Sequence, residues 1–68
     1  MFSKLTKQQL NDIYLDFLLS KNEGKRCESL VPYAYQYKEP FKDLMTVSTA
    51  VDIVTKIFFE EVASRYFN

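Results

Sequence analysis

The sequence has no histidine, no tryptophan and a single glycine. Without histidine, the chain lacks an imidazole base, a serine–histidine or cysteine–histidine nucleophile pair, and a histidine metal ligand. One glycine, Gly24, cannot build the glycine-rich loops that bind phosphates or dinucleotides. We therefore expect a protein that is not an enzyme and that needs no cofactor, metal ion or small-molecule substrate.

Cysteine is almost absent as well, because Cys27 is the only one. It has no partner for an internal disulfide, and one cysteine cannot build a zinc site. Small domains without disulfides are typical of the cell interior. Lys25 and Arg26 precede it and would lower the pKa of a nearby thiol. Two interpretations therefore stay open, a reactive thiol and, by default, a bystander at the edge of the core.

Long apolar runs and excess charge are also missing. No stretch approaches the roughly 18 apolar residues of a membrane span, and residues 1–7 do not resemble a signal peptide. Nine basic residues balance nine acidic ones, so no overall field attracts the chain to nucleic acid or to an anionic membrane. We expect a soluble cytoplasmic protein with no membrane partner. The abundance of Lys, Asn, Ile, Phe and Tyr indicates an AT-rich coding sequence, as in a low-GC bacterium or its phage.

What the chain does have is apolar and aromatic bulk. Hydrophobic residues make up 47% of 68 residues, which favours an ordered single domain over residues 1–68. So small a domain has little interior, so part of this bulk stays exposed or is buried between chains. Exposure would mean only that aromatic residues are scattered over the surface. Burial between chains would mean self-association or a partner.

The first predicted helix covers residues 6–21. Thr6 is a good N-cap, and Gln9 stands at the capping-box position. One face carries apolar residues at helical spacing, namely Leu10, Ile13, Tyr14, Phe17 and Leu18. Leu15 and Leu19 lie one turn apart on the opposite side. This second apolar stripe predicts either another neighbouring helix or contact with another molecule.

The middle segment, residues 29–38, allows two readings. A helix capped by Ser29 would place Pro32 in its first turn, where proline is tolerated. Extended structure would instead alternate the three tyrosines at positions 33, 35 and 37 with smaller residues. We favour the helix, because no second segment alternates well enough to pair with a strand.

Pro40 ends this segment and is expected to push Glu39 toward extended geometry. It can also open a short helical turn over residues 40–45. The last and longest helix is predicted over residues 47–66, with Thr46 or Ser48 as its cap. Its apolar residues follow a 3.6-residue period: Val47, Ala50, Val51, Val54, Ile57, Phe58 and Val62.

Together these patterns predict an all-α fold, a compact three-helix bundle with an additional short helical turn near Pro40. The surplus apolar residues are the candidate protein-binding site: Leu15, Leu19, Tyr35 and Phe59. Phe59 belongs there because its neighbours on the helix are polar and should be solvated. We expect a regulatory or adaptor protein that binds another protein, itself included as a homodimer, through an apolar helical surface.

The alternative function uses a small basic cluster. Lys21, Lys25 and Arg26 lie close together in sequence, and nearby tyrosines offer faces on which bases can stack. This combination is found in accessory proteins that bind nucleic acid. Glu23 and Glu28 dilute the charge, so we rank this function below protein binding.

Overall fold

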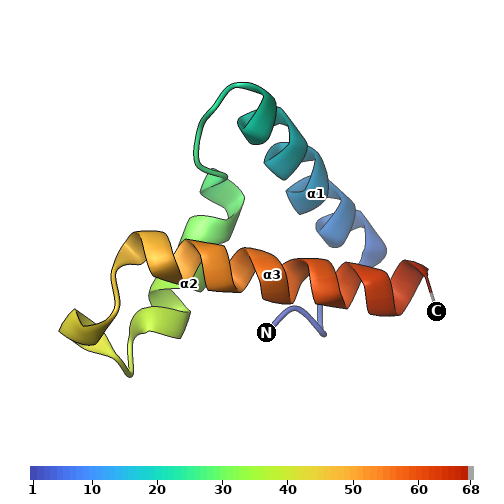
Figure 1. Cartoon of the computed structure of the whole chain (residues 1–68). Helices are drawn as coiled ribbons and strands as arrows, with labels where there is room; N and C mark the ends of the chain where they lie inside the picture. Colours follow the sequence, from blue (N-terminus) through green and yellow to red (C-terminus); the bar gives the residue numbers. More distant parts are fainter. Residues whose placement is uncertain (68) are drawn as a thin grey trace.

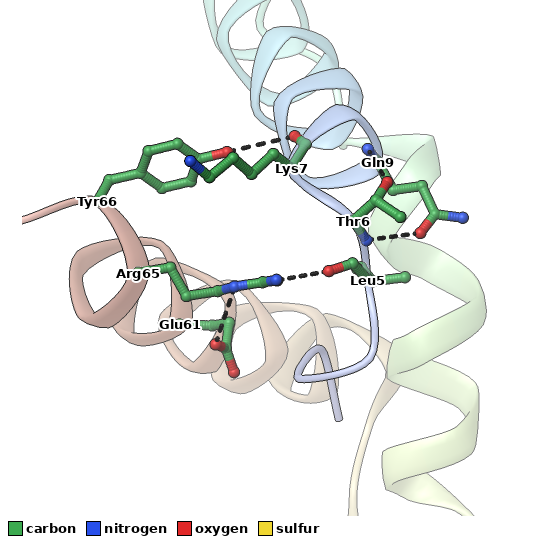
Figure 2. Close-up of polar contacts among 7 residues, drawn as sticks. All are labelled: Leu5, Thr6, Lys7, Gln9, Glu61, Arg65 and Tyr66. Atoms are coloured by element: carbon green, nitrogen blue, oxygen red, sulfur yellow. Dashed lines mark hydrogen bonds and ion pairs between the residues drawn. The ribbon is translucent and has the colours of Figure 1, made fainter.

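Both long helices begin at a threonine whose side chain caps the first turn. Thr6 Oγ1 accepts from the Gln9 N–H at 3.1 Å, and Gln9 Oε1 accepts from the Thr6 N–H at 2.8 Å, which completes the predicted capping box (Figure 2). Thr46 Oγ1 likewise accepts from the Thr49 N–H. In this computed structural model, which describes residues 1–67, the resulting helices are α1 (Lys7–Asn22) and α3 (Val47–Tyr66).

The middle segment is helical. A 3-10 helix, η1 (Glu28–Leu30), leads directly into α2 (Val31–Lys38), with proline in the first turn. The prediction of a helix over a strand is therefore confirmed. Ser29, however, does not act as the cap, because its hydroxyl and its N–H both donate to the Asp16 carboxylate of α1.

The turn after α2 differs from the prediction. Glu39 keeps helical angles, φ −48° and ψ −48°, because its N–H still bonds to the Tyr35 carbonyl at 3.2 Å. The expected turn over residues 40–45 is shorter, a 3-10 helix η2 (Lys42–Leu44). Leu44 is 92% exposed. This turn therefore adds little to the core.

The described residues contain no strand, so the all-α, three-helix prediction is confirmed. The N-terminal end of α1 meets the C-terminal end of α3, and α2 crosses the first half of α3 (Figure 1). The N-terminal residues lie alongside α3. With principal extents of 35 × 27 × 16 Å, the molecule is flattened along its shortest direction.

The core lies where the three helices and the N-terminal residues meet. It is formed by nine buried hydrophobic residues: Phe2, Leu10, Ile13, Cys27, Leu30, Ala34, Ala50, Val54 and Phe58. Phe2 is only 1% exposed, and its ring centre lies 4.7 Å from that of Tyr33 and 5.3 Å from that of Phe58. The periodicity of the helices gave no sign of Phe2, because it precedes every helix.

Candidate binding surfaces

The surplus leucines of α1 lie on the surface. Leu15 is 55% exposed, Leu19 58% and Leu18 44%. Leu18 was expected on the inner face but lies at its margin, and α1 buries Leu10 and Ile13 instead. Residues three and four apart are neighbours on a helix, so these leucines form one patch, here called the leucine face.

The leucine face points away from the core and has no charge within it. On α1, Gln8, Asn11 and Asn22 continue the leucine face along the helix axis, and all three are uncharged and exposed. Charged residues flank this stripe at the sides. An apolar centre with an uncharged polar border is typical of a protein interface.

Phe59 is not the exposed aromatic that its polar neighbours on the helix suggested. It is half-buried, with its ring centre 4.9 Å from that of Phe17 and 6.0 Å from that of Tyr14, both in edge-to-face geometry. The side of α3 that carries Phe59 faces α1 in this fold. Phe59 therefore joins the two helices, and only the part of its ring that lines the groove between them is open to a partner.

Tyr35, the remaining predicted contact, is 57% exposed. It projects from α2 and so belongs to a different helix from the leucine face. The structure therefore brings Leu15 and Leu19 together and adds Leu18 to them, while Tyr35 lies outside the leucine face.

An apolar groove of about 530 Å³ opens between α1 and α3. It is lined by Leu10, Asn11, Tyr14, Phe59, Val62, Ala63, Tyr66 and Phe67. Phe67, at 82% exposure, stands at its rim. Asn11 also borders the leucine face, so the groove and the leucine face adjoin across one side of α1.

Polar contacts, here called the clasp, join the end of α3 to the start of α1 (Figure 2). Arg65 Nη1 donates to the Leu5 carbonyl at 2.6 Å, and the Tyr66 hydroxyl donates to the Lys7 carbonyl at 3.3 Å. Glu61 lies 3.9 Å from the Arg65 guanidinium, one turn earlier on the helix. These contacts attach the last turn of α3 to the start of α1, and they fix the angle between the two helices.

The basic cluster is only partly assembled. Lys25 and Arg26 line a pocket of about 400 Å³ with Phe17, Cys27, Ser48, Val51, Asp52 and Thr55, whereas Lys21 is exposed outside that lining. Glu23 lies 3.5 Å from Lys25. Of the nearby tyrosines, Tyr33 is half-buried with its ring against Phe2, whereas Tyr35 is exposed on α2. The pocket thus brings two cations together with the Asp52 carboxylate, and the aromatic residue in its lining, Phe17, packs against Phe59.

Asp16 connects α1 to the loop that follows it. Its Oδ2 accepts from Ser29 Oγ at 2.6 Å, from the Ser29 N–H at 3.1 Å and from Cys27 Sγ at 3.3 Å. The bond from the Ser29 side chain, followed by those from the Ser29 backbone and Cys27, lowers the pKa of Asp16 below its ordinary value. Asp16, rather than Ser29, satisfies the first turn of η1.

Cys27 is 5% exposed. Burial raises the pKa of its thiol, and the hydrogen bond to Asp16 raises it further. The neighbouring cations, which were expected to lower this pKa, point to the surface instead. The structure thus favours the bystander interpretation of Cys27 over the reactive one.

Comparisons with protein-family models, with curated proteins and with solved structures find no match to this chain. Within residues 1–67, no helix is both long enough and apolar enough to cross a bilayer. The same residues hold no group of three or more acidic or cysteine side chains placed to share a metal ion. The surfaces described above are therefore the basis for a functional proposal.

Proposed function

We propose that this chain is a small non-enzymatic protein of the regulatory or adaptor type that binds a helical surface of another protein through the leucine face. One observation carries the proposal. Leu15, Leu18 and Leu19 stand side by side, each at least 44% exposed, with no charged residue among them. An exposed cluster of this kind costs solubility, and it is typical of interaction sites.

The expected strength of binding follows from the apolar area of the leucines that a partner would cover. Completing the burial of a half-exposed leucine contributes roughly 1 kcal/mol, so three leucines and three equivalents on a partner give about 6 kcal/mol. Association costs at least about 4 kcal/mol in lost freedom. The leucine face alone therefore supports only weak, reversible binding, and tighter binding requires additional contacts.

The groove between α1 and α3 is the nearest source of such contacts. It adjoins the leucine face at Asn11, and Tyr14, Phe59 and Val62 give it an apolar floor. A partner helix laid along α1 places one stripe on the leucines and can insert a side chain into this groove. Helices recognised in this way carry anchors three and four residues apart.

Photo-crosslinking in cells that express the protein tests this proposal. A benzophenone side chain at position 15 is expected to form protein adducts on irradiation, because it sits in the leucine face. The same group at position 60 serves as the matched control, because Glu60 is exposed on α3, away from the leucine face.

A second variant checks that the leucines are responsible. Leu19→Ser should reduce the adducts formed from position 15 several-fold without unfolding the chain. Equal adducts from positions 15 and 60, or none from either, would refute binding through the leucine face.

A further inference from the structure

We infer that the occupant of the leucine face is a second copy of this chain, whose α1 packs antiparallel to the first. This inference rests on the proposed function, since it names the partner of the same surface.

The spacing along the outer side of α1 is that of a helix-pairing seam. Gln8, Asn11, Leu15, Leu18 and Asn22 follow one another at alternating steps of three and four residues. This pattern lines up the residues of two helices that pack side by side at a small crossing angle. The seam therefore fits a helix better than it fits a strand or a loop.

An antiparallel copy matches this seam residue for residue. When Leu15 of one chain faces Leu18 of the other, Asn11 faces Asn22 at both ends of the pair. The leucines then form the centre, and each amide meets an amide that can both donate and accept. A two-fold interface requires this kind of self-complementarity.

Charge favours a copy of the same chain and sets its direction. The seam holds no charged residue, so two copies meet without like-charge repulsion at the centre. A parallel pair would bring together the two basic ends, each with Lys21, Lys25 and Arg26. In the antiparallel register Asn22 of one chain faces Asn11 of the other, so these ends lie roughly 16 Å apart along the helices and the two helix dipoles are opposed.

The fold leaves this side of α1 accessible. In Figure 1, α1 lies at one edge of the molecule, and no other helix of residues 1–67 is drawn beyond it. A standard interface buries about 800 Å² on each partner, more than three half-exposed leucines supply. We therefore expect a weak dimer that exchanges rapidly with the monomer.

Disulfide trapping tests the pairing and its direction. In a Cys27→Ala background, the Asn11→Cys and Asn22→Cys chains are mixed and oxidised mildly. The antiparallel seam predicts that the mixed disulfide dimer forms at least ten-fold faster than either self-linked dimer. The matched control pairs Asn11→Cys with Glu60→Cys, which should cross-link no faster than the background.

Sedimentation over a range of concentrations accompanies the trapping. The wild-type mass should rise toward twice the chain mass, and Leu15→Ser with Leu18→Ser should remain monomeric. Preferential self-linking of Asn11→Cys and of Asn22→Cys would overturn the antiparallel arrangement. If the wild type stays strictly monomeric, the leucine face does not bind a second copy of the chain. In that case, photo-crosslinked adducts from position 15 whose mass is not twice the chain mass would still support binding of another protein. A monomer without any adduct would overturn both.

Discussion

At the scale of single residues, the Asp16 carboxylate is a group whose hydrogen bonds make the stability of the fold depend on pH. One of its oxygens accepts three hydrogen bonds, which tie α1 to the loop at Cys27 and to the first turn of η1 at Ser29. These bonds favour the ionised carboxylate, so the folded state holds Asp16 at a lower pKa than the unfolded chain does. A lowered folded pKa stabilises the fold above the unfolded pKa, and this contribution is lost as the pH falls through the folded value.

Asp16→Asn should therefore weaken the acid dependence of folding. In denaturant unfolding from pH 6 to pH 3, the wild type is expected to have a higher free energy of unfolding than the variant near pH 6. The gap should narrow as the pH falls below about 4, the ordinary range of an unfolded aspartate. Asp12→Asn is the matched control, because Asp12 accepts only from the exposed Gln8 side chain. A gap between wild type and Asp16→Asn that stays constant over this range would contradict the assignment.

At the scale of elements, the sequence predicted the helices well where caps and periodicity agreed. α1 and α3 end within one residue of their predicted ends, and α2 formed as the favoured alternative. The exception is the turn after Pro40. There Glu39 completes a backbone bond to Tyr35 despite the following proline. The extended geometry that is usual before a proline was overridden by this one backbone hydrogen bond.

The candidate site was predicted only in part, because a helix wheel does not tell where the neighbouring helix lies. Leu15 and Leu19 were identified because they oppose the main apolar face. Leu18 and Phe59 changed sides: α1 packs on α3 through Phe17 and Tyr14, which covers Phe59 and leaves Leu18 outside. The crossing of α1 and α3 is a long-range property that periodicity within one helix does not contain.

The packing of Phe59 and the exposure of Leu19 predict unequal effects of two truncations on stability. Phe59→Ala should lower the free energy of unfolding by about 2–4 kcal/mol, because it removes a ring packed against Tyr14, Phe17 and Phe58. Leu19→Ala should change it by less than about 0.5 kcal/mol in dilute solution, because Leu19 is more than half exposed. Urea unfolding of both variants measures the difference. Equal losses would mean that α1 does not cover Phe59 as described.

At the scale of the whole molecule, three helices of unequal length are closed into one body by the N-terminal residues. Phe2 inserts between α2 and α3, where its ring meets Tyr33 and Phe58. A few residues later, the Leu5 carbonyl accepts from Arg65 at the far end of α3 (Figure 2). The segment before α1 thus contacts both α2 and the last turn of α3. Together with the contacts of Phe59 and Asp16, this segment holds α1 against the remaining helices.

Phe2→Ala is therefore expected to be among the most damaging single truncations in the chain. Removing a fully buried phenylalanine typically costs about 3–5 kcal/mol. A domain of this length has only roughly 3–10 kcal/mol of stability in total. We expect the variant to lose a large share of its folded population at 37 °C, as measured by circular dichroism with thermal and urea unfolding. Phe67→Ala is the matched control, since Phe67 is 82% exposed at the other end and should leave stability nearly unchanged. If the two variants were equally stable, the N-terminal segment would not close the core, and the orientation of α1 would depend on the clasp at Arg65 and on the contacts of Phe59 and Asp16.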